Sequence, residues 1–236
     1  LHSFPTRRSS DLATGYSTMP TLHSMGSGTG LASGFAKLAP FGLDKPILTV
    51  CGDSTFYHAV IPALINAQHN RADITFIVLD NAGTAMTGFQ PHPGLPVSAV
   101  KETVPAVDIE AICRAIGAEV EVSDPFDLDR TGKILTRFLS EKGRLKVLIL
   151  RQACALSPEK KGKKRFEVAV DETLCVGEAC GCNRLCTRIF RCPGLTWDRT
   201  KKKAVIDEVI CAGCGVCALI CPQKAIVKTD LSVSPS

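Results

Sequence analysis

Between Thr18 and Gln152, short apolar runs alternate with longer stretches whose apolar positions recur at helical spacing. A nearly continuous apolar run of this length is typical of a strand buried in a parallel sheet. Strands are expected at Ile47–Cys51, Ile74–Leu79, Val120–Val122 and Lys146–Leu150. Strands that alternate with helices favour a parallel sheet covered on both faces. The pattern therefore predicts an α/β domain with a doubly wound parallel sheet.

Four helices are expected around these strands, at Met25–Leu38, His58–Asn70, Asp108–Gly117 and Asp127–Lys142. The second contains Pro62, which a helix tolerates in its first turn because the N–H groups there have no partner within the helix. Asp108 is a favourable N-cap for the third helix, and Gly117 is a favourable residue at its end.

Residues beyond about 150 differ in character. The basic run Pro158–Arg165 reads as a solvated linker, because no aromatic residues are interleaved with its lysines as nucleic-acid binding would favour. The expected domains are 13–152 for the α/β part, 153–166 for the linker, 167–229 for a small α+β domain and 230–236 for a tail. Residues 1–12 resemble translated sequencing-adapter sequence, and we treat them as a non-native segment at the start of a C-terminal part of a longer protein.

The composition is typical of a globular protein with a cysteine-rich C-terminal part. With 236 residues, 45% hydrophobic and 22% charged, the chain is globular, and no apolar run approaches the ~18–20 residues of a membrane helix. The formal charge is +5, and residues 151–236 hold 15 Lys or Arg against 9 Asp or Glu. Nine of the twelve cysteines fall between Cys175 and Cys221. Without a visible signal peptide, clustered thiols indicate a metal site in a reducing, cytoplasmic compartment.

The most specific motif in the chain is Cys211-Ala-Gly-Cys214-Gly-Val-Cys217-Ala-Leu-Ile-Cys221-Pro222. Three thiolates spaced two residues apart can bind three irons of one cubane, while the fourth serves a neighbouring cluster. Zinc sites instead pair two short Cys hooks across about 12–20 residues. The spacing therefore favours a [4Fe–4S] cluster over zinc.

A less regular copy of this motif lies upstream and contains Cys175, Cys180, Cys182, Cys186 and Cys192-Pro193. The two Cys-Pro pairs are 29 residues apart, which indicates a domain built by duplication. The copy has an insertion before Cys186 and one thiol more than a second cubane needs. Cys180 and Cys182 are separated by one glycine, so an extended loop would point them in opposite directions. We expect only one of these two to ligate.

The expected ligand sets follow from the crossing-over of each Cys-Pro thiol. Cys192, Cys211, Cys214 and Cys217 are expected to bind one cluster. The other cluster is expected to take Cys221, Cys186 and two of Cys175, Cys180 and Cys182. Low-potential electron transfer is the chemistry that such clusters support.

Acidic and amide side chains end two of the predicted strands in the α/β part. Gly52-Asp53-Ser54 follows one strand and Asn81 follows the next. Open α/β sheets bind ligands at the carboxyl ends of their strands. Mg²⁺ prefers oxygen ligands and often binds through one or two protein groups plus phosphate oxygens. Asp53, Asn81 and the Gly83 carbonyl are therefore expected to hold Mg²⁺, with a diphosphate completing the shell.

Two glycine-containing segments are candidates to bind the diphosphate itself. Gly26-Ser27-Gly28 precedes a helix N-terminus, where backbone N–H groups favour phosphate, although small residues there could simply allow close packing on the sheet. Downstream, the segment Thr84–Gly88 could wrap the diphosphate from the other side. The full set of expected cofactor contacts is Gly26, Ser27, Gly28, Gly52, Asp53, Ser54, Asn81, Gly83, Thr84, Met86 and Thr87. No catalytic residue is identified; His58 and His92 are weak candidates, with capping or packing as the alternative.

The run Gly52–Gly94 resembles the cofactor domain of indolepyruvate ferredoxin oxidoreductase alpha subunits, in the 2-oxoacid:ferredoxin oxidoreductase family. Phe166–Thr229 resembles a bacterial-type ferredoxin with two [4Fe–4S] clusters. The resemblance implies thiamine diphosphate, Mg²⁺ and CoA as co-substrate, with ferredoxin and a second (beta) subunit as partners. It implies oxidative decarboxylation of an arylpyruvate such as indolepyruvate, with electrons passed through both clusters to ferredoxin. Neither nucleic acid nor membrane is an expected partner.

Two alternatives remain open. The enzyme could act on another 2-oxoacid such as pyruvate, or the chain could be an electron-transfer or assembly subunit with an inactive thiamine domain. The region that binds the aminopyrimidine in relatives lies N-terminal to the part present here. This piece alone is therefore expected to be inactive.

Overall fold

The computed structural model describes residues 24–154, 157 and 164–231 of the chain. These residues fall into two compact units, Leu1–Ser157 and Pro158–Ser236, and each is described by itself. The segment 1–12 and most of the basic run 158–165 lie outside the described residues. No helix in the described ranges is long and apolar enough to cross a membrane.

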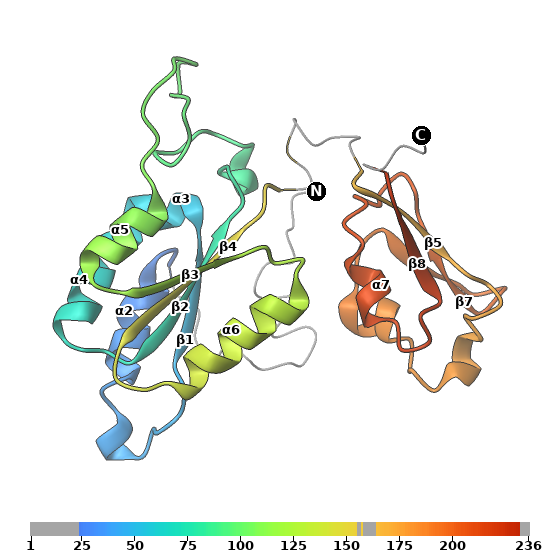
Figure 1. The fold of residues 1–236 in the computed structure, drawn as a ribbon, viewed down its shortest axis with the longest axis horizontal. Coiled ribbons are helices and arrows are strands. Elements are labelled where there is room, and N and C mark those ends of the chain that lie inside the picture. The colour runs from blue at the N-terminus through green and yellow to red at the C-terminus, as the bar shows by residue number, and fades with distance from the viewer. Residues whose placement is uncertain (1–23, 155–156, 158–163, 232–236) are drawn as a thin grey trace. The chain divides into compact units, whose positions relative to one another are not determined.

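The first unit is built on a four-stranded sheet, shown with its helices in Figure 1. Its strands are β1 (Leu48–Gly52), β2 (Ile74–Asp80), β3 (Glu119–Ser123) and β4 (Leu145–Arg151). Their order in the sheet is β1-β2-β4-β3, and all three pairings are parallel. Both the parallel sheet and its four expected strands are confirmed. Because β1 and β2 are neighbours, the residues that follow them lie at one edge of the sheet.

Helices cover both faces of this sheet. The helices are α2 (Ser27–Phe35), α4 (Ile61–His69), α5 (Ile109–Ile116) and α6 (Leu128–Ser140). The first three contribute to the larger core, in which Phe56, Leu64 and Phe76 are fully buried. The opposite face carries α6, whose Ile134 and Phe138 pack on Ile77 and Leu148. The fold is therefore doubly wound, as predicted.

Capping contacts confirm both predicted ends of α5 and the predicted start of α6, whereas α6 ends at Ser140, two residues before the predicted Lys142. Asp108 Oδ1 accepts a hydrogen bond from the Glu110 N–H at 2.9 Å, and Gly117 ends α5 with φ +91°. Asp127 Oδ1 accepts from the Arg130 N–H at 3.0 Å and begins α6. An N-cap of this kind stabilises a helix by about 1 kcal/mol.

The helix expected at His58–Asn70 begins five residues earlier than predicted. A short helix α3 (Asp53–Thr55) follows β1 at once, then a π-helical turn (Phe56–Val60) leads into α4. Pro62 is the second residue of α4 (Ile61–His69) and so lies in the first turn of that helix, where the N–H that proline lacks would have no partner within the helix.

The second unit is a small α+β structure of two antiparallel strand pairs. Its strands are β5 (Phe166–Val170), β6 (Leu195–Asp198), β7 (Lys203–Ile206) and β8 (Ile226–Asp230). β5 pairs with β8, and β6 pairs with β7. A short helix α7 (Val216–Ile220) precedes β8, and a π-helical turn (Leu185–Phe190) precedes β6. Each half thus runs strand, loop, helical turn, strand.

The hydrogen bonds of the second unit repeat with the same order. Asp171 Oδ1 accepts from the N–H of the second and third residues beyond it, and Asp207 Oδ1 does the same. The N–H of Cys175 donates to the Asp171 carbonyl at 2.9 Å, and that of Cys211 donates to the Asp207 carbonyl at 2.8 Å. These Asp-x-x-x-Cys turns are 36 residues apart, against 29 for the Cys-Pro pairs. The first copy therefore carries seven extra residues between its first Cys and its Cys-Pro.

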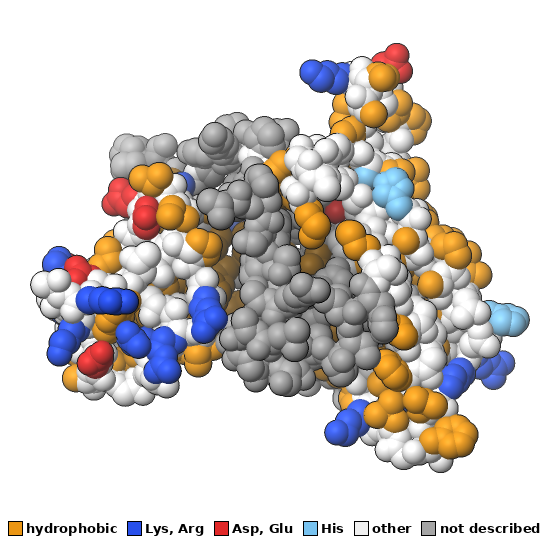
Figure 2. All heavy atoms as spheres, turned by 180° about the vertical axis from the view of Figure 1, so that it is seen from behind, with side chains coloured by type: hydrophobic (Ala, Val, Ile, Leu, Met, Phe, Trp, Pro, Cys, Tyr) orange, Lys and Arg blue, Asp and Glu red, His pale blue; other side chains and the backbone are white. Residues whose placement is uncertain are grey.

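Basic side chains are frequent on the surface of the second unit, as the view in Figure 2 shows. The exposed ones are Arg165, Arg188, Arg191, Arg199, Lys201, Lys202, Lys224 and Lys228. Lys201 pairs with Glu172 at 2.7 Å, but both side chains are more than half exposed, so the pair contributes little to stability.

Candidate cofactor sites

Asp53 is the centre of the site in the first unit. It is the first residue of α3, directly after β1, and it is only 2% exposed. Its Oδ1 accepts the Ser54 N–H at 2.8 Å. Its Oδ2 accepts the N–H groups of Asn81 at 3.1 Å and Gly83 at 3.2 Å. A buried carboxylate needs such donors, because burial without them strongly disfavours its charge.

The turn after β2 brings those donors to Asp53. Ala82 adopts φ +60°, a left-handed conformation that an L-residue with a side chain rarely takes. This conformation lets the N–H groups of Asn81 and Gly83 face the same carboxylate oxygen. Backbone strain of this kind is found at functional sites, where the surrounding structure imposes it.

Asn81 carries an unused acceptor beside this carboxylate. Its Oδ1 is buried and accepts no hydrogen bond from any described residue. A buried polar atom without a partner costs about 1–3 kcal/mol. The Gly83 carbonyl accepts the Ala85 N–H at 2.8 Å and keeps one lone pair free. Unused oxygens of Asp53, Asn81 and Gly83 are a donor set that fits a hard divalent cation.

His92 reaches the same carboxylate from a distant loop. Its Nε2 is 3.1 Å from Asp53 Oδ2, and its ring stacks on Tyr57 with centroids 5.4 Å apart. The Tyr57 hydroxyl donates to the Val107 carbonyl. Burial and the nearby carboxylates of Asp80, Asp108 and Asp53 raise the pKa of Tyr57 to about 12. The contacts of His92 with Asp53 and Tyr57 could not be predicted from local sequence pattern, because His92 is distant from both residues along the chain.

His58 takes no part in this arrangement. It lies on the π-helical turn and is exposed, and its side chain forms no hydrogen bond or ion pair with any described residue. Of the two weak catalytic candidates, the structure brings only His92 to Asp53.

The glycines before α2 have packing reasons for their identity. A Cβ on Gly26 would lie 2.6 Å from Ala59 Cβ, and Gly26 has φ +86°. A Cβ on Gly28 would lie 2.6 Å from the Thr49 hydroxyl oxygen. Close packing of α2 on the sheet and on the π-helical turn therefore explains both glycines without a ligand. Ser27 donates from its hydroxyl to the Ser24 carbonyl at 2.7 Å.

The other expected diphosphate contacts lie at the ends of β1 and β2. After β1, Gly52 is the last residue of the strand and Ser54 is partly buried in α3. Thr84, Met86 and Thr87 follow β2. Thr84 forms an isolated bridge with Gln90, and the Thr87 hydroxyl lies 2.6 Å from Gln90 Oε1. The Met86 side chain is 52% exposed.

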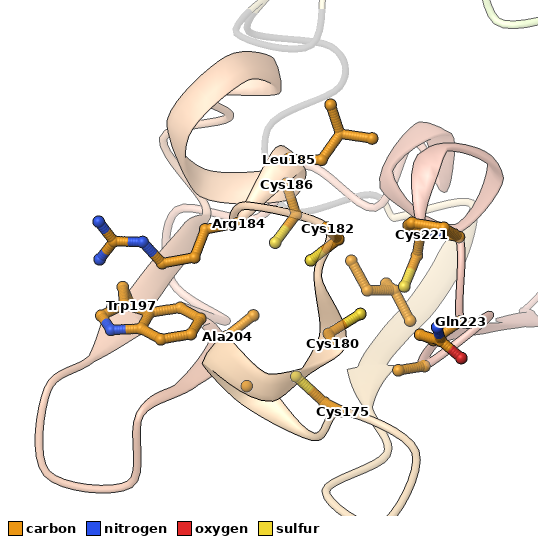
Figure 3. A pocket seen from close by; sticks show the side chains of 14 residues that line it. Cys175, Cys180, Cys182, Arg184, Leu185, Cys186, Trp197, Ala204, Cys221 and Gln223 are labelled. Carbon is orange, nitrogen blue, oxygen red and sulfur yellow. The ribbon is translucent and has the colours of Figure 1, made fainter.

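Five thiols of the second unit surround one pocket. Its lining includes Cys175, Cys180, Cys182, Cys186 and Cys221, and Figure 3 shows their sulfur atoms facing a common space. Trp197 and Ala204 close one side of it, and the Arg184 guanidinium lies 5.1 Å from the Trp197 ring centre. Burial raises the pKa of Cys186, and the neighbouring thiols Cys182 and Cys175 add to the shift.

The remaining four thiols form a second group. Burial raises the pKa of Cys217 to about 11, with further contributions from Cys214, Cys192 and Cys211. Burial raises the pKa of the Cys192 thiol, and the neighbouring thiols Cys214 and Cys211 raise it further. Cys192, Cys211 and Cys217 also pack in the same hydrophobic cluster of this unit. Each group contains soft thiols without carboxylates, which suits iron–sulfur chemistry better than a hard cation.

The described residues contain no arrangement of three His, Cys, Asp or Glu side chains able to hold a single metal ion. This finding does not count amide and backbone oxygens, which two of the three expected Mg²⁺ ligands supply. Within each of the two thiol groups, the described cysteines likewise do not form a site for a single metal ion.

The geometric argument for a spare thiol at Cys180 or Cys182 is wrong. The loop is not extended, because Gly177–Cys180 is a 3-10 turn and Gly181 has φ +70°. Both thiols line the same pocket and are hydrogen-bonded to each other. That hydrogen bond raises the pKa of Cys180; it also lowers the pKa of Cys182, against the effect of burial.

The first unit is an α/β domain with a buried carboxylate and an unpartnered amide oxygen at the carboxyl edge of its parallel sheet, the edge at which open α/β sheets bind ligands. Residues 4–149 match the family described as thiamine pyrophosphate enzyme, C-terminal TPP binding domain, and the chain belongs to this family. The matching region begins within the segment 1–12 that we treated as non-native.

Curated relatives extend the match into the second unit. The chain is 41% identical over 208 residues to indolepyruvate oxidoreductase subunit IorA of Archaeoglobus fulgidus, covering 86% of this chain and 31% of the relative. It is 37% identical over 229 residues to the subunit IorA of Pyrococcus horikoshii, covering 89% and 34%. The resemblance predicted from the sequence is confirmed. The chain spans about a third of the length of these relatives.

Solved structures share less with this chain. A 2-oxoglutarate:ferredoxin oxidoreductase from Magnetococcus marinus has a TM-score of 0.47 at 14% identity, covering 55% of this chain and 46% of that one. A transketolase from Campylobacter jejuni has a TM-score of 0.44 at 20% identity, covering 59% and 21%.

Proposed function

We propose that the chain is the thiamine diphosphate-binding and electron-transfer part of a 2-oxoacid:ferredoxin oxidoreductase that acts on arylpyruvates such as indolepyruvate. The observation that carries the proposal is the presence, in one chain, of a thiamine pyrophosphate enzyme domain and a unit with two groups of thiols. The reaction converts an arylpyruvate, CoA and two oxidised ferredoxins into an arylacetyl-CoA, CO₂, a proton and two reduced ferredoxins.

In this proposal, oxygens of Asp53, Asn81 and Gly83 hold Mg²⁺, and the cation binds the diphosphate. The unpartnered Asn81 Oδ1 supports this assignment, because a cation would remove the cost of burying it. Thiamine diphosphate, when bound, supplies the electron sink for loss of CO₂ from the 2-oxoacid.

Backbone groups and small side chains then contact the diphosphate. These are Gly26, Ser27 and Gly28 at the start of α2, Gly52 and Ser54 beside Asp53, and Thr84, Met86 and Thr87 after β2. The N-terminus of α2 supports the first set, since the dipole of a helix favours anionic ligands at this end.

The two thiol groups are proposed to hold two [4Fe–4S] clusters that carry electrons to ferredoxin. One cluster takes Cys192, Cys211, Cys214 and Cys217. The other takes Cys221, Cys186 and two of Cys175, Cys180 and Cys182. The repeated Asp-x-x-x-Cys turns support a duplicated, ferredoxin-type unit. Basic residues of this unit offset the negative charge of such clusters.

The complete enzyme requires more than this chain. CoA as co-substrate, a beta subunit and the aminopyrimidine-binding region are proposed to belong to the full assembly, in a reducing cytoplasm. The relatives are about three times longer than the matched part, which is consistent with this division.

The test uses the full assembly, purified without oxygen and assayed for ferredoxin reduction with CoA and either indolepyruvate or pyruvate. We expect indolepyruvate-dependent reduction and about eight irons with eight labile sulfides per chain. Preference for pyruvate would assign another 2-oxoacid. Stoichiometric zinc without sulfide would contradict the cluster assignment.

A further inference from the structure

The pair formed by His92 and Asp53 has a geometry that the cation site alone does not require. The two side chains are 39 residues apart in sequence and are each only 2% exposed, with His92 Nε2 at 3.1 Å from Asp53 Oδ2. His92 lies in the long loop between the turn after β2 and α5. A buried tertiary contact of this kind fixes the loop and the carboxylate relative to each other.

The hydrogen bonds of the imidazole identify its tautomer. The Gly94 N–H points at His92 Nδ1 from 3.1 Å. A ring nitrogen that accepts a hydrogen bond carries no proton, so the proton of this ring is on Nε2. His92 is then a neutral donor to Asp53 Oδ2. Stacking on Tyr57, with 26° between the ring planes, holds the imidazole in this orientation.

The donors around Asp53 are distributed unequally between its two oxygens. Oδ2 accepts three, from Asn81 N–H, Gly83 N–H and His92 Nε2–H. Oδ1 accepts only the Ser54 N–H. A carboxylate oxygen offers about two lone-pair directions, so three donors more than fill Oδ2, whereas the single donor on Oδ1 leaves one direction free. Oδ1 is therefore the oxygen with room for a cation.

We propose that His92 is a positioning residue that determines which oxygen of Asp53 binds Mg²⁺. By donating to Oδ2 it fixes the carboxylate so that Oδ1 is the oxygen presented to the cation. This inference rests on the proposed function, because it needs Asp53 to be a Mg²⁺ ligand. Groups that orient metal ligands by hydrogen bonding typically contribute about 10–100-fold to metal affinity.

Two substitutions separate donation from packing. His92→Phe keeps a ring that can stack on Tyr57 but removes the donor, whereas His92→Gln keeps a terminal N–H donor without the ring. We expect His92→Phe to weaken Mg²⁺-dependent thiamine diphosphate binding to the full assembly by about 10–100-fold, and His92→Gln to restore most of the affinity. Ser98→Ala is the matched control, because the Ser98 hydroxyl accepts the Glu102 N–H in the same loop, away from Asp53. It should leave the affinity unchanged.

The measurement is a Mg²⁺ titration of thiamine diphosphate binding by calorimetry. Unchanged affinity in His92→Phe, or equal losses in the Phe and Gln variants, would overturn the inference. The ¹⁵N NMR spectrum of the histidine-labelled wild-type assembly gives a second readout that needs no variant to fold. A neutral His92 with its proton on Nε2 is expected, and a proton on Nδ1 would also overturn the inference. Failure of the proposed function itself would appear in the wild type, as binding that does not depend on Mg²⁺.

Discussion

At the scale of single residues, Asp53 shows how one side chain links strand, helix and loop. It follows the last residue of β1, begins α3, and receives N–H groups from the turn after β2 and an imidazole from a distant loop. The negative charge is favoured by these donors and by the N-terminus of the helical run that it begins. Each hydrogen bond restricts the orientation of the carboxylate, and a fixed orientation is what a metal ligand needs.

Tyr57 supports this region through a neutral hydroxyl, and its titration is testable. Its pKa is raised from 10.0 to about 12, first by burial and then by Asp80, Asp108 and Asp53. A raised pKa means that folding favours the protonated phenol, so the associated stability is complete below pH 10. It is lost as the pH rises from about 10 to about 12.

Ultraviolet titration of tyrosinate can measure this, because the chain contains only two tyrosines. The Tyr57→Phe variant identifies the signal of Tyr57 by its loss. We expect the signal that is lost in Tyr57→Phe to titrate in the wild type with a pKa of about 12, compared with 10.0 for an ordinary tyrosine. Titration of both tyrosines near pH 10 in the folded protein would show that Tyr57 is not buried as described.

Cys180 and Cys182 give a second prediction at this scale. Five thiols line the pocket, and a cubane takes four, two of which we assign to Cys186 and Cys221. One of Cys175, Cys180 and Cys182 is therefore surplus, although the hydrogen bond between the last two gives no preference between them. We expect one of the variants Cys175→Ser, Cys180→Ser and Cys182→Ser to keep both clusters, as judged by iron content and low-temperature EPR of the reduced protein. Loss of a cluster in all three variants would show that none of these thiols is spare, with Cys186→Ser as the control that should lose one.

At the scale of elements, the sequence predicted what local rules control. Asp108, Gly117 and Asp127 marked helix ends correctly, because caps depend on neighbouring residues in the chain. The start of the helical run at Asp53 was missed, because the π-helical turn before Pro62 depends on tertiary packing. The contact of His92 with Asp53 was likewise beyond local pattern, because it joins a loop to a strand end.

Helix α2 offers a matched pair of glycines for the next prediction. A Cβ on Gly28 would lie 2.6 Å from the Thr49 hydroxyl oxygen, whereas one on Gly30 would meet no described atom within 4 Å. We expect Gly28→Ala to destabilise the first unit by about 1–3 kcal/mol through overpacking. Gly30→Ala should stabilise it by about 0.5–1 kcal/mol, because alanine is the better helix former.

Urea denaturation followed by far-UV circular dichroism measures both variants. Tryptophan fluorescence does not serve here, because the single Trp197 lies in the second unit. Equal stability of the two variants would mean that α2 does not pack on β1 as closely as described. Loss of thiamine diphosphate binding in a stable Gly28→Ala variant would instead favour a direct role of Gly28 at the diphosphate.

At the scale of the whole molecule, two units have separate cores and different chemistry. The first unit packs its core around the parallel sheet, and the second packs Val168, Leu195 and Ile226 beside the thiols. Their division was visible in the sequence as the basic run 158–165 and the change in cysteine density. The assignment of each thiol to a cluster depends on loop conformation, as Cys180 and Cys182 show, and spacing alone could not provide it.

Separate cores predict that each cofactor can be removed without the other. Asp53→Ala should lower Mg²⁺-dependent thiamine diphosphate affinity by more than about 100-fold, because it removes a ligand rather than a group that orients one. It should leave about eight irons and the EPR spectrum of the reduced clusters unchanged.

Cys217→Ser should do the reverse, reducing iron to about four per chain while thiamine diphosphate still binds. Calorimetry and iron analysis on the same anaerobic samples of the full assembly measure both effects. Loss of iron in Asp53→Ala, or of thiamine diphosphate binding in Cys217→Ser, would show that the two units depend on each other for folding.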